Sequence, residues 1–188
     1  MGVPFHTPPP MTADEFFAFT ATRPDEEKWE LIDGEPVMNA SASRLHAIIA
    51  GNIFAQLQPF WAGRHDKWEV LQNLSVRVSD TRVPVPDVLV RPNIAVKGSE
   101  CDDMVVAFEV LSPSTADRDL RWKRKAYSTL PSLRQYVVLA QDAIEAFSYD
   151  RANDFAERRF DSPESLIDLP ALNTSLRLSD LYIGTGHS

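Results

Sequence analysis

The chain has 188 residues, of which 44% are hydrophobic and 24% are charged, and its formal net charge is −8. These values predict one globular domain with a sizeable core and exclude a disordered chain. The acidic balance argues against a protein that coats nucleic acid, although an enzyme could still contact nucleic acid locally. The single cysteine, Cys101, allows neither an internal disulfide nor a thiolate metal site.

Neither a membrane span nor a secretory signal is predicted. No apolar run approaches the roughly 18–20 residues that cross a bilayer, and residues 1–10 lack a basic segment followed by an apolar one. With its lone cysteine, the chain is expected to be cytoplasmic. Residues 1–11, rich in proline, are interpreted as a loose lead-in, and residues 12–188 as a single domain without repeats.

The first half of the chain predicts two helices and a hairpin. A capping-box pattern opens a helix expected over residues 12–22. Asp33 and Gly34 form a two-residue turn at the centre of a hairpin expected over residues 29–38. Apolar residues at helical spacing predict a second helix over residues 43–61.

Strands dominate the second half. Apolar or alternating runs predict strands over residues 68–78, 83–90, 105–111, 135–140, 143–149 and 155–160. A third helix is expected from Ser114 or Asp117 to about Leu130. The leucine-rich tail, residues 166–182, is interpreted as irregular chain packed on the core. The fold class is therefore α/β (α+β), with a mixed central sheet flanked by helices.

Two carboxylates lie inside the apolar runs. Asp87 follows Pro86 in the run over residues 83–90, and Glu109 lies in the run over residues 105–111. Runs this rich in β-branched and aromatic residues are typical of buried strands. A bare carboxylate there is costly unless a cation, a proton or hydrogen-bond donors compensate for it. The pair suggests a divalent metal between successive strands, and hence metal-dependent hydrolysis.

The third helix carries a lysine at a core-facing position. Lys123 completes an apolar stripe at helical spacing whose other members are Ala116, Leu120, Tyr127 and Leu130. A core-facing ammonium must be paired or must reach water. Because the helix follows the Glu109 strand, packing across that strand would bring Lys123 toward Glu109. Pairing with Asp119, one helical turn earlier, is the alternative.

The remaining basic residues of this helix fall on its outer side: Arg118, Arg121, Arg124 and Lys125. Two interpretations stay open for them. They form an ordinary solvated helix face, or they bind the phosphates of DNA.

Together these motifs resemble the PD-(D/E)XK nuclease superfamily and, more narrowly, the Uma-two family of restriction-endonuclease-like proteins. The resemblance covers residues 12–182. Its matching stretches are residues 29–35, His46, Pro86-Asp87-Val88, residues 109–115, Asp119, Lys123, Tyr127 and residues 135–138. The ordered series Glu-Val-Leu-Ser-Pro-Ser-Thr before a Lys-x-x-x-Tyr helix makes the match specific.

The resemblance implies an endonuclease that hydrolyses DNA phosphodiester bonds with Mg²⁺ (or Mn²⁺). Asp87, Glu109 and the backbone carbonyl of Val110 would be the metal ligands, since hard cations prefer oxygen. Leu111 stands where the superfamily usually has a lysine, and Lys123 is the natural substitute from the adjacent helix. A homodimer or higher homo-oligomer is also expected.

Two further residues are candidates for the site. Glu30 is a candidate outer ligand or water-positioning acid, and an exposed hairpin carboxylate is the alternative. His46 matches the family's histidine, whereas a lone histidine on that side of a helix is often a satisfied core residue.

Two rival functions remain. A non-catalytic PD-(D/E)XK-like module for DNA binding or assembly is favoured by the acidic charge and by Leu111. A metal-independent hydrolase would use Ser112 or Ser114 with His46, but the chain has no G-x-S-x-G motif.

Overall fold

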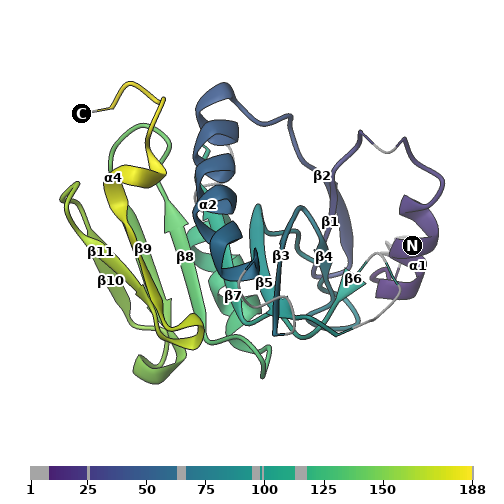
Figure 1. Cartoon of the computed structure of the whole chain (residues 1–188). Coiled ribbons are helices and arrows are strands. Elements are labelled where there is room, and N and C mark those ends of the chain that lie inside the picture. The colour runs from purple at the N-terminus through teal and green to yellow at the C-terminus, as the bar shows by residue number, and fades with distance from the viewer. Residues whose placement is uncertain are drawn as a thin grey trace, which may run out of the picture.

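The computed structural model describes residues 9–24, 26–62, 67–94, 98, 100–112 and 118–187. Its centre is a six-stranded sheet in the order β10-β9-β8-β7-β5-β3 (Figure 1). The strands are β3 (Trp68–Gln72), β5 (Val88–Pro92), β7 (Val106–Val110), β8 (Gln135–Leu139), β9 (Ala146–Asp150) and β10 (Glu157–Phe160). β7 and β8 pair in parallel, and the other neighbours pair antiparallel, which confirms the expected mixed sheet.

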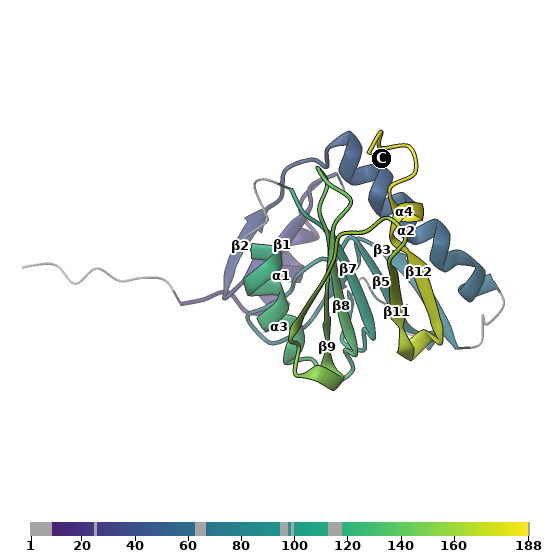
Figure 2. The same cartoon turned by 90° about the vertical axis from the view of Figure 1, so that its left-hand side faces the viewer.

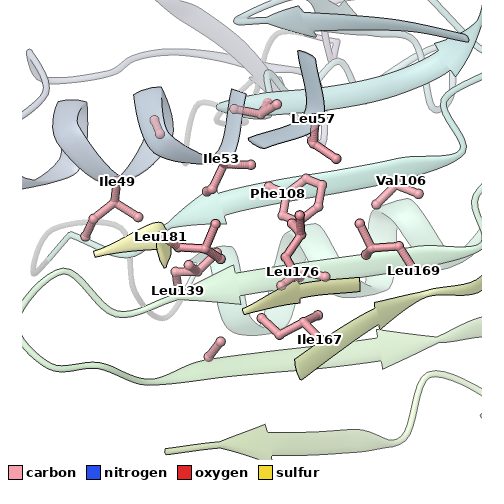
Figure 3. Packing of buried hydrophobic residues seen from close by; sticks show 14 of the residues in the cluster. Ile49, Ile53, Leu57, Val106, Phe108, Leu139, Ile167, Leu169, Leu176 and Leu181 are labelled. Carbon is pink, nitrogen blue, oxygen red and sulfur yellow. The ribbon is translucent and has the colours of Figure 1, made fainter. Parts of the chain in front are cut away.

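One face of the sheet is covered by α2 (Arg44–Ala62), by a hairpin of β11 (Leu166–Leu169) and β12 (Thr174–Arg177), and by α4 (Leu178–Leu181). Figure 3 shows Ile53 and Leu57 of α2 close to Phe108 of β7. Each large apolar side chain buried in this way contributes about 1.5–3 kcal/mol. This face is therefore an apolar core.

The opposite face carries the helix that follows β7 (Figure 2). It consists of a six-residue π-helix, η1 (Arg118–Lys123), continued by α3 (Arg124–Ser128). Tyr127 of α3 packs edge-on against Tyr136 of β8. Two short parallel strands, β4 (Ser75–Val76) and β6 (Glu100–Cys101), lie in the same layer. Cys101 is buried there, and burial raises the pKa of its thiol to about 12.

An N-terminal unit docks beside this layer: α1 (Ala13–Thr20) and the hairpin of β1 (Trp29–Ile32) and β2 (Glu35–Met38). The expected capping box is present, with Thr12 and Glu15 bonded reciprocally. At the hairpin turn, Gly34 has φ +88°, and a Cβ there would lie 2.3 Å from the Cβ of Pro10. Met11 N also donates to Gly34 O at 2.9 Å. The last residues of the expected lead-in are therefore attached to the hairpin.

Several predicted boundaries were wrong. The first helix ends at Thr20, not at residue 22. The run over residues 68–78 is divided into β3 and β4, and Asp87 directly precedes β5 instead of lying within it. The tail is regular, since β11 and β12 form an antiparallel hairpin and α4 follows. Ser114 and Asp117, the expected caps of the third helix, lie outside the described residues.

No helix in the described part of the chain is both long enough and apolar enough to cross a membrane.

Candidate active site

Asp87 and Glu109 lie side by side at one end of the sheet. β5 and β7 are antiparallel, with Val88 opposite Phe108. Asp87, the residue before Val88, therefore lies beside Glu109, the residue after Phe108. Val110 N donates to Asp87 Oδ2 at 2.8 Å, which holds that carboxylate against the end of β7. Both acids are nearly inaccessible, at 5% and 3% exposure. The structure thus places both carboxylates together, as predicted.

Lys123 enters the same cluster from η1. Its side chain is buried, and its Nζ lies 2.7 Å from Glu109 Oε1 and 2.9 Å from Glu30 Oε1. Asp119 Oδ1 lies 3.6 Å away, so the pairing one turn earlier is present as well. Tyr127 donates its hydroxyl to Glu109 Oε1 at 3.2 Å. The ammonium of Lys123 therefore lies within ion-pairing distance of three buried carboxylates.

Glu30 reaches the cluster from the hairpin strand β1. It is fully buried, and its Oε1 accepts a hydrogen bond from Val85 N at 2.8 Å. Leu31 forms an antiparallel bridge with Val83, which aligns β1 with the chain that leads to Asp87. The alternative of an exposed hairpin carboxylate is therefore wrong.

Asp87 has two nitrogen-bearing neighbours from other segments. His46 Nε2 lies 3.0 Å from Asp87 Oδ1, and Lys28 Nζ lies 3.3 Å from the same oxygen. His46 is in the first turn of α2, where its backbone N–H donates to Ser43 Oγ at 3.1 Å. Sequence reasoning missed Lys28. The signal was its place two residues before Glu30, because alternate residues of a strand share a face.

The charge of Asp87 is stabilised by these neighbours. Burial alone would raise the pKa of the carboxyl, but the hydrogen bond from His46 and the charges of His46, Lys28 and Lys123 outweigh it. The pKa of Asp87 is consequently below its usual range. Asp87 is thus an anion at neutral pH.

The pKa of Glu109 is shifted in the opposite direction to that of Asp87. Burial raises its pKa well above the usual value, and the charges of Asp87, Asp119 and Glu30 add to that effect, which Lys123 only partly offsets. Burial lowers the pKa of Lys123, but the surrounding carboxylates prevail and raise it above its usual range. The lysine therefore stays protonated. Among the described side chains, four buried carboxylates (Glu30, Asp87, Glu109 and Asp119) surround the ammonium of Lys123, and repulsion between gathered carboxylates favours the binding of a further cation.

These groups lie at the base of a cavity of about 720 Å³. Within the described segments, no three or more His, Cys, Asp or Glu side chains converge as a ready-made metal cage. Mg²⁺, however, usually binds through one or two carboxylates and keeps several waters. The donor set of Asp87, Glu109 and the Val110 carbonyl fits such an ion.

The carbonyl of Val110 has the orientation that this set requires. A strand residue directs its N–H and C=O to the same side, and the N–H of Val110 donates to Asp87. The next residue, Leu111, donates its N–H to Leu139 O on the opposite side, toward β8.

Three of the four predicted nucleic-acid-binding residues, Arg121, Arg124 and Lys125, lie apart from the cavity. Arg121 and Lys125 are exposed, and the guanidinium of Arg124 stacks over the ring of Tyr149 at 4.9 Å. None of these three residues lines the cavity. The side chain of Arg118 lies outside the described atoms.

The serine candidates of the rival hydrolase do not form a described dyad. Ser112 lines the cavity, Ser114 lies outside the described residues, and the Nε2 atom of His46 faces Asp87.

The fold matches that of a solved nuclease-like structure. A structure described as "Crystal structure of a putative nuclease belonging to DUF820 from Anabaena variabilis ATCC 29413" has a TM-score of 0.76 to this chain. The match covers 92% of this chain and 98% of that chain at 18% sequence identity. At this identity the similarity establishes a shared α/β fold.

The family is established independently. The model of the Uma2 family, described as "Putative restriction endonuclease", matches residues 13–180, so the chain belongs to the Uma2 family. This confirms the resemblance seen in the sequence motifs. No curated protein matches the chain.

Proposed function

We propose that the protein is a metal-dependent endonuclease that hydrolyses phosphodiester bonds of DNA. One observation carries the proposal. Two buried carboxylates, Asp87 and Glu109, meet a buried lysine, Lys123, at the base of a cavity in a chain of the Uma2 family.

Asp87, Glu109 and the carbonyl of Val110 would hold Mg²⁺ (or Mn²⁺). When bound, the ion neutralises phosphate charge and lowers the pKa of a coordinated water. The raised pKa of Glu109 supports this assignment, because a divalent cation would relieve the repulsion from neighbouring carboxylates that contributes to it.

Lys123 would act as a fixed positive charge. Its pKa is raised by the carboxylates around it, so it cannot serve as a base at neutral pH. A preorganised ammonium stabilises negative charge that develops on a phosphorane, and it does so most effectively where water is excluded. Glu30 and Tyr127 would position the groups on either side, since Glu30 contacts Lys123 and Tyr127 contacts Glu109.

His46 would orient Asp87. Its Nε2 contacts one carboxylate oxygen, and Val110 N holds the other. Hydrogen-bond partners that fix a ligating carboxylate are a regular part of metal sites.

The outer basic residues, Arg118, Arg121, Arg124 and Lys125, would bind phosphates of the same DNA away from the scissile bond. A homo-oligomeric state and a cytoplasmic location belong to the proposal as well. The single cysteine supports the cytoplasmic location.

The test is cleavage of plasmid, linear duplex and single-stranded DNA with Mg²⁺, with Mn²⁺ and with chelator. Activity should require the metal and should be lost in Asp87→Asn and in Glu109→Gln. Glu35→Gln removes an exposed carboxylate of β2 that does not line the cavity, so it should retain activity. A wild-type protein that binds DNA but cleaves none of these substrates with either metal would support the binding module instead.

A further inference from the structure

The cavity lies above the acid–lysine cluster, which consists of Glu30, Asp87, Glu109 and Lys123. This cavity is small for a nuclease substrate. Its volume of about 720 Å³ falls in the range of roughly 300–1,000 Å³ that encloses a drug-sized ligand, which is the size of one or two nucleotides. A duplex, whose major groove alone is about 12 Å wide, is too large to enter it. The acids at its base are nevertheless almost inaccessible, with Asp87 at 5% and Glu109 at 3% exposure.

The small number of positive charges in the described cavity walls also disfavours a duplex substrate. Among the described lining residues, Lys28 and Lys123 are the only lysines or arginines, and Glu26 and Glu27 add negative charge. A protein that follows a duplex backbone often makes about 6–10 phosphate contacts. The two lysines of the described walls match one or two phosphates, so any longer run of phosphate contacts would lie outside the cavity.

The walls offer uncharged hydrogen-bonding groups instead. They are the side chains of Asn39, Ser41, Ser43, Gln72, Asn73 and Gln141. Ser43 at the start of α2 donates to Gln141 Oε1 at 2.8 Å, so one wall is closed by a bond between segments distant in sequence. Amides and hydroxyls of this kind pair with the Watson–Crick edges of bases, which are free only when the nucleotide is unpaired.

We propose that this cavity receives an unpaired stretch of a DNA strand, so that the preferred substrate is single-stranded or locally strand-separated DNA. The inference rests on the proposed function for the phosphate that is cut. What the inference adds is that the strand entering the cavity is unpaired. Lys28, the more exposed of the two lysines, contacts a phosphate of the entering strand, and the amide walls contact its bases.

The experiment compares three DNA forms of one sequence: a single strand, a blunt duplex and a duplex with a central unpaired loop. Cleavage is measured with Mg²⁺, and binding is measured by fluorescence anisotropy with Glu109→Gln, which keeps the cavity but lacks the metal-binding charge. The single strand and the looped duplex should be bound with about tenfold higher affinity than the blunt duplex. They should also be cut about tenfold faster. Equal or tighter binding of the blunt duplex would overturn the inference.

The binding arm separates this inference from the proposed function. If wild-type protein cuts no DNA with Mg²⁺ or Mn²⁺ while Glu109→Gln still prefers the single strand, the nuclease proposal fails and the inference stands. If wild-type protein cuts the blunt duplex as fast as the single strand, the nuclease proposal stands and the inference fails.

A matched pair of variants tests the cavity itself. Ala47 lies on the face of α2 that lines the cavity and is exposed, so Ala47→Trp should fill the space without disturbing the core. Ala55→Trp places the same group on an exposed position of α2 outside the cavity. Single-strand binding should fall about tenfold in the first and stay within about twofold in the second. If Ala47→Trp does not fold, Gln141→Glu adds negative charge to the same wall and should weaken single-strand binding. Unchanged binding in the folded variant would refute the inference.

Discussion

Replacing Lys123 by methionine should destabilise the protein strongly. Lys123 is 2% exposed, and its Nζ lies 2.7 Å from Glu109, 2.9 Å from Glu30 and 3.6 Å from Asp119, so its removal leaves three buried carboxylates without this cation. Breaking a buried ion pair by removing one partner costs roughly 3–5 kcal/mol. In a chain of this length that corresponds to a fall in Tm of roughly 6–20 °C. Urea denaturation would measure the free energy of unfolding directly.

The loss should depend on pH in a defined direction. The pKa of Glu109 is raised in the folded state, so the contribution of its protonated form to stability is complete below its usual pKa of 4.5 and is lost as the pH rises through the folded pKa. Without Lys123 that folded pKa rises further. The destabilisation by Lys123→Met should therefore be larger at pH 8 than at pH 5. Lys123 itself stays charged across this window, because its pKa is raised.

Lys125→Met is the matched control, since Lys125 is exposed on the same helix. Exposed substitutions usually change stability by no more than about 0.5 kcal/mol. If the two variants lose similar stability, or if the loss in Lys123→Met is the same at both pH values, the buried pairing is refuted. The result also bears on activity assays, because a Lys123 variant that is partly unfolded would be inactive for reasons unrelated to catalysis.

Four other outcomes follow from the same geometry. Tyr127→Phe removes a hydrogen bond to the buried Glu109 and should cost about 1.5–3 kcal/mol in urea denaturation, and no change would mean that the bond is not formed. Mg²⁺ or Mn²⁺ should raise Tm by mass action, and a shift that persists in Asp87→Asn combined with Glu109→Gln would place the metal elsewhere. Because a ligating carboxylate must be deprotonated and burial raises the pKa of Glu109, Mn²⁺ affinity should rise with pH, and an affinity independent of pH would contradict the assignment. Lys125→Ala should weaken DNA binding and lower the salt slope by about one, whereas an unchanged slope would leave Lys125 as an ordinary solvated residue.

The centre of the site could be predicted because its signals are local. A carboxylate in an apolar run marked Asp87 and Glu109, and a cation in an apolar helical stripe marked Lys123. In each case burial of a charge required a partner. Glu109 and Lys123 proved to be partners of each other, whereas Asp87 is paired mainly with His46 and Lys28. The sheet and its flanking helices followed from the same periodicities.

The contacts that depend on distant segments could not be predicted in this way. Glu30 lies in a four-residue strand, and so short an alternation does not indicate which face is buried. Its backbone partner, Val85, is 55 residues away. The contacts of Lys28 and His46 with Asp87 likewise depend on how α2 and the hairpin dock.

The C-terminal hairpin was missed for a compositional reason. β11 is leucine-rich, and leucine is not a marked strand former, so the segment does not resemble a strand. The turn does carry a signal, because Asn173 has φ +55°, a conformation that asparagine adopts more readily than most residues. Asn173 was therefore the local sign of this turn, whereas the alternating burial of β11 becomes visible only in the folded structure.

The wide sequence spacing of the acid–lysine cluster has a kinetic consequence. The cluster draws its side chains from four segments, with Glu30, Asp87, Glu109 and Lys123 as its members. They meet only after β5 has paired with β7 and after the helix formed by η1 and α3 has docked on the sheet. Contacts between such distant segments require long loops to close first, so they form late in folding. Interactions absent from the transition state affect the unfolding rate rather than the folding rate. We therefore expect Lys123→Met to accelerate unfolding while leaving refolding nearly unchanged, which makes this cluster a determinant of the lifetime of the native state.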